Sequence, residues 1–411
     1  MSISDLYNED FCETGFFDVI ESLLDYRGKT PLKLGMSWSD VETPYLALSA
    51  LNVKDNGIDT TKEAHYGTAD LYKKWMKDKP LREQQILMTT EAPAGVVMQI
   101  PDNRPYILSQ RVIALNVDPT KVDECFFAYL LRSHYVQNQI ERLCSGGTAK
   151  GISQKHLKEI KVRYPKSIKT QQKIAEFFTA LDEKIHSIEN KLSLLDRTKK
   201  YFVNALLQKK LRFVKDNGST YTDWVSCNVA NIADVIGGGT PSTTDEAYWN
   251  GDINWFTPAE INSKYLIPSK RKISKLGLDN SSAKLLPKNS LLLTTRASLG
   301  LCSINSLDSF VCTNQGFQSL ICKENAFHEF VYYMVTSDAF KKELKTKASG
   351  STFLEVSSAS LKSIKIEIPC YEEQIKIANF ISQMDLKIEL LVKQKKVFEK
   401  MKKAFMQRMF V

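Results

Sequence analysis

The sequence predicts an α/β protein made of two similar halves, each a globular α/β unit followed by a long helix. Three observations support this fold class. Two segments carry long apolar stripes at coiled-coil spacing, an offset of about 203 residues relates the two halves, and short strands alternate with helical stretches before each stripe. We therefore expect two α/β domains, separated by two long coiled-coil helices that pair antiparallel, in an internal pseudo-twofold repeat.

The composition is that of an ordinary globular protein. Of 411 residues, 43% are hydrophobic and 25% are charged, and no apolar run approaches the roughly 18–20 residues of a membrane span. The start, MSISDLYNED, is acidic and does not resemble a secretion signal, which predicts a cytoplasmic protein without membrane contact. The eight cysteines are scattered without a C-x-x-C pair, which favours buried free thiols over a disulfide or metal framework.

The positive charge is concentrated in the two striped segments. The net charge is +9, but residues 1–169 hold 22 basic and 22 acidic side chains and are neutral. Residues 170–212 hold nine basic and five acidic side chains, and residues 372–411 hold the same numbers. The basic excess therefore lies on two matching segments.

Those segments repeat one apolar pattern. In both, the stripe steps by 4, 3, 4, 3, 4 and 3 residues, and each position differs from its counterpart by 203. A stripe of this length without Gly or Pro predicts a coiled-coil helix, and the simplest partner for each helix is the other. The predicted interface residues are Ile174, Phe178, Leu181, Ile185, Ile188, Leu192, Leu195 and Phe202 in the first helix, and Ile377, Ile381, Met384, Ile388, Leu391, Phe398 and Phe405 in the second.

The repeat continues upstream of the helices. Each half contains a turn, then a short alternating strand ending in proline, then the long helix. The matched stretches are Gly28–Pro31 with Gly238–Pro241, Thr89-Thr90 with Thr294-Thr295, Ser109-Gln110 with Asn314-Gln315, Ser145–Thr148 with Ser349–Thr352, and Pro165 with Pro369. The function of these matched stretches is therefore present in both halves.

Periodicity places the main elements and the boundaries. We expect domains at 1–168 and 214–371 and helices at 169–213 and 372–411, with the polar stretch VKDNGSTYT (Val214–Thr222) as a linker. The expected strands are Tyr45–Leu51, Gln85–Thr90, Val112–Leu115, Ile253–Phe256, Ser290–Thr295 and Phe317–Ile321, and the expected helical stretches are Val122–Cys144 and Glu324–Thr346.

No catalytic motif is present. The run GGGTPSTTDEAYWNGDINWFTPAEI, from Gly237 to Ile261, lacks the Lys-Ser or Lys-Thr pair of a phosphate-binding loop and is better explained as a tight turn after a strand. The five histidines lack the spacing of a metal site, and no G-x-S-x-G sequence appears. We therefore expect no catalytic residue, metal site or bound cofactor in this chain.

The combination of motifs resembles a known family. GGGTPS, GDINWFTP, LLTTRASLG, TNQGFQSL and QQKIAEFFTALDEKI, in the order unit–helix–unit–helix, are similar to the specificity (S) subunit, HsdS, of type I restriction-modification systems. The resemblance implies that each globular unit is a target recognition domain for one half of a split DNA site. It also implies that the helices dock two methyltransferase (M) subunits and, through them, restriction (R) subunits. S-adenosylmethionine, ATP and magnesium would then belong to the partners.

Basic and amide side chains are the expected DNA contacts. Clusters that precede each Thr-Thr pair are on their own typical of a solvated surface, but their duplication favours phosphate contact. Gln, Asn and Arg side chains near the repeat motifs are of the types that read base edges, and the hydroxyls of the two Thr-Pro turns either approach DNA or only shape the turn. The predicted contacts are Lys29, Thr30, Lys73, Lys74, Lys77, Arg82, Gln110 and Arg111 in the first unit, and Thr240, Lys264, Tyr265, Lys270, Arg271, Lys272, Arg296, Asn314 and Gln315 in the second.

Two other functions stay open from the sequence alone. One is an enzyme with a scattered carboxylate site, and the other is a coiled-coil scaffold whose units bind proteins rather than DNA. A helix of about 40 residues spans on the order of 60 Å, so an antiparallel pair that separates two reading units predicts a bipartite target with an unread gap of fixed length.

Overall fold

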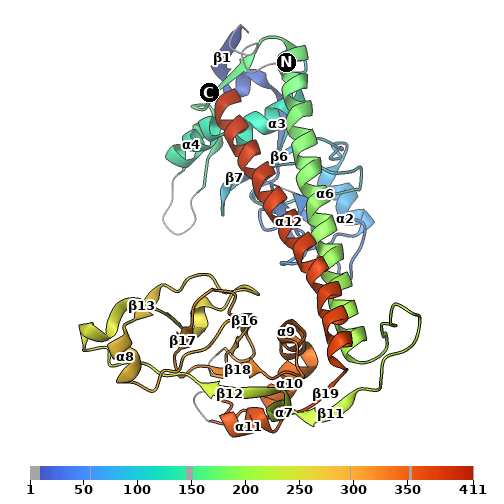
Figure 1. Cartoon of the computed structure of the whole chain (residues 1–411). Helices are drawn as coiled ribbons and strands as arrows, with labels where there is room; N and C mark the ends of the chain where they lie inside the picture. The colour runs from blue at the N-terminus through green and yellow to red at the C-terminus, as the bar shows by residue number, and fades with distance from the viewer. Residues whose placement is uncertain (1–9, 56, 145–150, 297, 351–353, 411) are drawn as a thin grey trace. The chain divides into compact units, whose positions relative to one another are not determined.

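The chain forms two compact units. The computed structural model describes residues 10–55, 57–144, 151–296, 298–350 and 354–410. The first unit comprises Met1–Glu189 and Lys393–Val411, and the second comprises Asn190–Val392. Each unit therefore holds one globular part and one half of each long helix, α6 (Ile168–Leu207) and α12 (Tyr371–Met409), which Figure 1 shows in green and red.

The first unit is built around a four-stranded antiparallel sheet in the order β2-β9-β6-β7. The strand pair β1-β10 is antiparallel and β3-β8 is parallel. Its elements before α6 are β1 (Phe11–Gly15), η1 (Phe16–Val19), β2 (Ile20–Asp25), η2 (Leu32–Leu34), β3 (Ala47–Leu48), β4 (Val53–Lys54), β5 (Gly57–Ile58), α2 (Ala69–Met76), β6 (Ile86–Thr90), β7 (Ala94–Gln99), β8 (Ile107–Leu108), β9 (Val112–Val117), α3 (Glu124–Arg132), α4 (His134–Leu143), α5 (Gln154–Leu157) and β10 (Lys161–Pro165).

The second unit repeats the main features of this plan, although its parallel pair carries a third strand, β14, and the first unit has a separate β4-β5 hairpin. Its four-stranded sheet has the order β12-β18-β15-β16, β11 pairs with β19, and β13 pairs in parallel with β17. The elements are β11 (Val225–Asn228), α7 (Val229–Ile232), β12 (Ala233–Gly237), η3 (Glu246–Tyr248), β13 (Trp249–Phe256), η4 (Pro258–Glu260), β14 (Arg271–Ile273), α8 (Lys275–Asp279), β15 (Leu291–Leu293), β16 (Cys302–Ile304), β17 (Val311–Thr313), β18 (Gln318–Cys322), α9 (His328–Thr336), α10 (Asp338–Thr346), α11 (Ser358–Lys362) and β19 (Lys365–Ile368). The predicted α/β class and internal repeat are confirmed.

Each of the two predicted helical stretches is in fact two helices. Ser133 ends α3 and begins α4 with an extended backbone, and its hydroxyl accepts a hydrogen bond from the amide of Val136. Ser337 does the same between α9 and α10, accepting from Phe340. A serine that caps the next helix leaves the helical conformation, so apolar periodicity alone could not reveal the break.

The two long helices pack antiparallel in both units. In the first, Asp182 pairs with Lys402 and Glu189 pairs with Lys395, so residue numbers rise along α6 as they fall along α12. In the second, Lys199 pairs with Asp385 and Phe202 contacts Phe380, which is the same antiparallel sense. None of the fifteen predicted stripe residues is exposed, and complete burial of a large apolar side chain, as at Ile174 and Ile381, contributes about 1.5–3 kcal/mol. The predicted antiparallel pairing is confirmed.

Other sequence expectations have mixed outcomes. In the described part of the chain, no helix combines the length and the apolarity needed to cross a membrane. Cys302 and Cys312 are buried and the other six cysteines are partly exposed, so the expectation of buried thiols holds for those two. The repeated turns at Ser145–Thr148 and Ser349–Thr352 lie wholly or partly outside the described residues.

Candidate nucleic-acid interface

In the first unit, the Thr-Pro turn faces the polar loop between β8 and β9. Together they line a hollow of about 380 Å³ that includes Lys29, Thr30, Gln110 and Arg111. These four predicted contacts are far apart in the sequence and are brought together by the fold. Lys29 donates a hydrogen bond to the carbonyl of Trp75 at 2.6 Å, and burial, with the charge of Lys77, lowers its pKa.

In the second unit, the equivalent turn packs directly on the equivalent loop. A Cβ atom on Gly238 would lie 1.9 Å from the carbonyl oxygen of Asn314, so only glycine permits this approach. Gly239 is held by its amide to Thr313 at 2.8 Å. Thr240 then donates its hydroxyl to the amide oxygen of Gln315. The glycine-rich run is therefore a close-packed turn that places Thr240 beside the polar loop.

The end of the Thr-Thr strand completes the site identically in both units. The amide of Thr90 donates to the carbonyl of Arg111 at 2.8 Å, and the amide of Thr295 donates to Gly316 at 2.9 Å. The first threonine of each pair closes the adjoining turn, since Thr89 donates to the carbonyl of Pro93 and Thr294 donates to that of Ser298. Each unit thus joins a Thr-Pro turn, a polar loop and the strand end.

The remaining basic residues of the first unit lie on an exposed helix. Lys73 and Lys74 are exposed on α2, and Lys77, also exposed, follows directly after it. Thr68 caps α2 by accepting from Leu71, and Trp75 buries the opposite face. Arg82 is exposed but is ion-paired with Glu124 at 2.7 Å. These side chains surround the site without forming part of the hollow.

The basic residues of the second unit lie on different elements. Lys270, Arg271 and Lys272 follow a loop into β14 and are exposed. The guanidinium of Arg271 lies 3.7 Å from the ring centre of Trp249 and 5.3 Å from that of Trp255, a cation–π arrangement. The expectation that the two basic clusters match is therefore wrong, because one is helical and the other is not.

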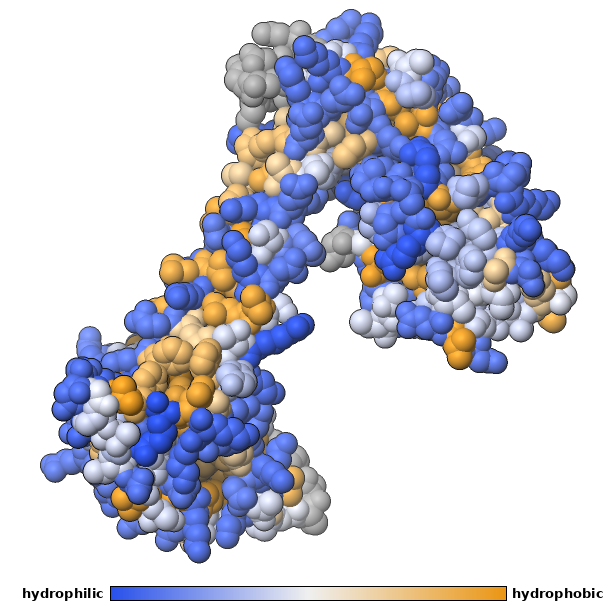
Figure 2. Space-filling model, turned by 90° about the vertical axis from the view of Figure 1, so that its right-hand side faces the viewer, coloured by the Kyte–Doolittle hydropathy of each residue, from blue (hydrophilic) through white to orange (hydrophobic). Residues whose placement is uncertain are grey.

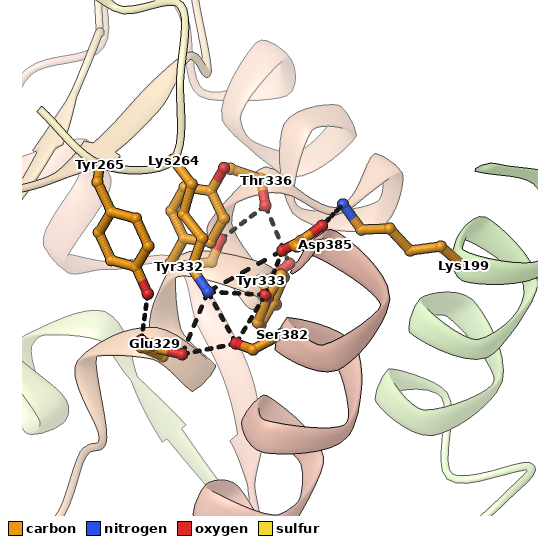
Figure 3. A network of polar contacts seen from close by, with 9 residues as sticks. All are labelled: Lys199, Lys264, Tyr265, Glu329, Tyr332, Tyr333, Thr336, Ser382 and Asp385. Atoms are coloured by element: carbon orange, nitrogen blue, oxygen red, sulfur yellow. Dashed lines mark hydrogen bonds and ion pairs between the residues drawn. The ribbon is translucent and has the colours of Figure 1, made fainter. Parts of the chain in front are cut away.

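Lys264 is not a surface contact, which corrects its assignment to DNA. Its side chain is only 12% exposed, and its ammonium pairs with Glu329 at 3.2 Å and donates to Tyr333 and Ser382 at 2.8 Å each (Figure 3). Burial lowers the pKa of Lys264, although the charge of Glu329 opposes this. An ammonium committed to buried partners is not available to a phosphate.

Tyr265 belongs to the same buried network. Its hydroxyl donates to Glu329 at 2.5 Å (Figure 3), and burial, with that hydrogen bond, raises its pKa. The prediction of a DNA contact for Tyr265 is thereby also corrected for the hydroxyl, although the residue itself is 42% exposed.

A second duplicated contact links the helices and escaped sequence reasoning. In the first unit, Lys402 of α12 pairs with Asp182 of α6, which also accepts from Tyr129 at 2.9 Å. In the second, Lys199 of α6 pairs with Asp385 of α12, which accepts from Tyr333. The aspartates and the lysines are both 203 residues apart, so the repeat contained the signal.

The described residues show no group of three or more His, Cys, Asp or Glu side chains that could hold a metal ion. His186, on α6, is exposed and lies 3.9 Å from Glu189. Each of the two sites offers hydrogen-bonding groups and positive charge.

Comparison with known proteins agrees with this duplication. The family model described as type I restriction modification DNA specificity domain matches twice, at residues 11–197 and 221–400. The MjaIX specificity subunit of a type I restriction enzyme of Methanocaldococcus jannaschii is 36% identical over 48% of this chain and 46% of that protein, so the match spans about half of that relative. The EcoR124I/EcoR124II specificity subunit of Escherichia coli is 27% identical over 52% of this chain and 50% of that protein.

A solved structure shares the fold. The S subunit of a type I restriction-modification system from M. genitalium matches with a TM-score of 0.62 and 14% identity, and the match covers 98% of this chain and 97% of that one.

Proposed function

Because the chain belongs to the type I restriction modification DNA specificity family, we propose that it is the DNA specificity subunit of such a system. Each unit would read one half of a bipartite double-stranded target. The chain binds without reacting, and S-adenosylmethionine, ATP and magnesium bind to its methyltransferase and restriction partners. It would act in the cytoplasm.

One observation carries this proposal. Both units bring a Thr-Pro turn, a polar loop and the end of a Thr-Thr strand together, with the same backbone hydrogen bond from the second threonine to the loop, although the loop sequences differ. A common backbone frame with different side chains suits two units that read two different short sequences. Contacts to base edges determine which sequence is bound, and the frame positions the side chains that make those contacts.

The two long helices carry exposed apolar residues that suit the docking of two methyltransferase subunits. Leu194 on α6 is 67% exposed, and its counterpart 203 residues later, Val397 on α12, is 61% exposed. Further apolar side chains are exposed on α12 at Leu386 and Leu390, and Figure 2 shows hydrophobic surface on the helices among hydrophilic residues. Exposed apolar residues on otherwise charged helices are typical of a protein interface, and their duplication supports one methyltransferase subunit per repeat.

A unit exchange tests the reading function. Residues 1–168 are replaced by the first unit of another family member, and the modified sequence is determined by sequencing DNA from cells that hold the methyltransferase partner. We expect one half of the target to change and the other to stay. A change in both halves, or sequence-independent modification by the unaltered chain, would contradict independent reading.

The stoichiometry has its own test. The mass of the co-expressed complex should correspond to two methyltransferase subunits per chain. L194D and V397D should each remove one of them, and a complex that keeps both after both changes would show that these helix faces are not the docking sites.

A further inference from the structure

An arginine and a glutamate pair next to the Thr-Thr pair in both units, but the residue that follows the two threonines is the glutamate in the first unit and the arginine in the second. In the first unit, Glu91 follows the Thr-Thr pair and Arg111 lies on the loop, with Nε and Oε2 3.4 Å apart. In the second, Arg296 follows the Thr-Thr pair, and its Nε lies 3.7 Å from Glu355. Glu355 pairs with Arg296 across an isolated bridge, as Gly151 pairs with Glu91. The two units thus reach one charge arrangement from different sequence positions.

Stability does not account for these pairs. The side chains are half-exposed, at 50% and 37% for the first pair and 45% and 45% for the second. Such pairs contribute about 0–1 kcal/mol. An arrangement that adds little stability and yet occurs in both units, each time at the residue that follows the Thr-Thr pair, indicates a role in binding.

The backbone of Arg111 gives an independent indication. Its φ is 63°, in the left-handed region that a side chain rarely adopts. The residue with the equivalent hydrogen bond in the second unit is Gly316, which does not share the positive φ and whose added Cβ would lie 2.8 Å from Pro258. A long side chain kept at a strained position beside a hollow is typical of a functional site.

The chemistry of the pair selects a base edge. In both pairs the arginine nitrogen closest to the glutamate carboxylate is Nε, so the ion pair does not depend on the two terminal nitrogens of the guanidinium. That planar group matches the two acceptors of guanine, O6 and N7, in the major groove. A carboxylate beside it repels phosphates and so disfavours contact with the DNA backbone.

We propose that Arg111 and Arg296 each read a guanine in their own half of the target. Glu91 and Glu355 are positioning residues that hold the guanidinium and keep phosphates away. This inference rests on the proposed function and names the residues that determine specificity within it.

The test uses the full chain in complex with its methyltransferase partner, with the modified sequence as the readout. Arg111→Gly removes the side chain and adopts the positive φ without strain, and Arg111→Lys keeps the charge without the planar guanidinium. Arg104→Ala is the matched control, because Arg104 is an exposed arginine of the same unit, paired with Asp102 through Nε at 2.9 Å. Complex mass confirms assembly of each variant.

We expect both Arg111 variants to relax one G·C position in the first half, with a loss of discrimination of roughly 5- to 150-fold. The second half should be unchanged, and Arg104→Ala should change neither. Arg296→Gln should relax the second half alone. An unaltered modified sequence in the Arg111 variants would overturn the proposal, and so would a uniform loss of affinity with a salt slope lower by about one, which marks a phosphate contact.

Glu91→Gln separates positioning from reading. The modified sequence should persist, while binding to unrelated DNA strengthens and its salt slope grows by up to about one, because Arg111 is released towards phosphates. If Glu91→Gln relaxed the same position as Arg111→Gly, Glu91 would itself be a reader and the positioning role would be wrong. If the unaltered complex modified no defined sequence, the proposed function would fail independently of any Arg111 variant.

Discussion

The two units differ most where each globular part meets its half of the helix pair. In the second unit, Lys264 enters this place and binds α9 through Glu329 and α12 through Ser382 (Figure 3). In the first unit, a loop from the same part of the fold brings Asp55, whose carboxylate accepts from the amide of Val97 at 3.3 Å. A groove of about 870 Å³ lies there, lined by Asp55 and Asp182.

The same fold therefore attaches its globular part to the helix pair in two different ways. The lysine–aspartate–tyrosine contact between the helices is common to both units. Among the described residues, the second unit alone adds a buried ammonium between the loop, α9 and α12. Since the partners of Lys264 are mostly buried, the attachment of this loop depends on polar complementarity, whereas the first unit leaves the equivalent place open.

The largest expected effect concerns a buried charge found in the second unit. Glu373 is fully buried and pairs with Arg212 at 2.8 Å, whereas the corresponding position 203 residues earlier is Thr170. Arg212→Met should destabilise the second unit by about 3–5 kcal/mol, because it leaves a buried carboxylate unpaired. The loss of stability is measured by hydrogen exchange of the backbone amides in α9 and β16.

The control for Arg212 is an exposed pair in the same unit. Lys209 and Glu367 are 2.7 Å apart with side chains 40% and 50% exposed. Lys209→Met should cost about 0–1 kcal/mol. Equal effects of the two changes would show that burial of Glu373 does not set the difference.

The next effect tests the network itself. Lys264→Met should destabilise the second unit by about 2 kcal/mol, less than the full value for a buried pair because Glu329 keeps 17% exposure. We expect exchange to accelerate in β16 as well as in α9, since the loop and the helix are linked by this lysine. Protection that stays unchanged in β16 would mean that Lys264 does not tie the loop to the helices.

Acid should weaken the second unit through Glu329. Burial by itself raises the pKa of Glu329, but hydrogen bonds from Tyr265 and Ser382 and the charge of Lys264 outweigh it, so the pKa lies below its ordinary value. The folded state therefore binds this proton less readily than the unfolded state. The stabilisation is present above the ordinary pKa of about 4.3 and is lost as the pH falls through the lower folded pKa.

Glu329→Gln checks this pH dependence. Denaturant unfolding at each pH measures the free energy of unfolding. Between about pH 5 and pH 3, the variant should not show the part of the stability loss that protonation of Glu329 causes. The first unit has Cys125 at the corresponding position and should show no equivalent component. An identical pH profile for Glu329→Gln and the unaltered chain would remove Glu329 from the explanation.

The smallest effect is expected for the lysine of the first unit. Lys402 and Asp182 have side chains 27% and 35% exposed, so Lys402→Met should cost on the order of 1 kcal/mol. A loss as large as that of Lys264→Met would show that the shared helix contact, rather than the added lysine, dominates in both units.

Some features were determined by the sequence alone. The 203-residue offset and the 4–3 apolar stripe predicted two α/β units and two paired helices, because heptad spacing leaves one narrow face to bury and the repeat supplies its partner. The matched Thr-Pro turns and Ser109-Gln110 and Asn314-Gln315 loops predicted that a site is present twice, although not that turn and loop touch.

Only the tertiary structure decided which side chains are available for binding. Lys264 and Lys270 have the same chemistry and lie six residues apart, yet one is buried against Glu329 and the other is exposed. Burial depends on contacts with α9 and α12, more than 60 residues away in the chain, and these leave no local signal. The arginine–glutamate pairs likewise became visible only in the tertiary structure, because Glu91 meets Arg111 in the first unit and Arg296 meets Glu355 in the second, and neither partner is a sequence neighbour.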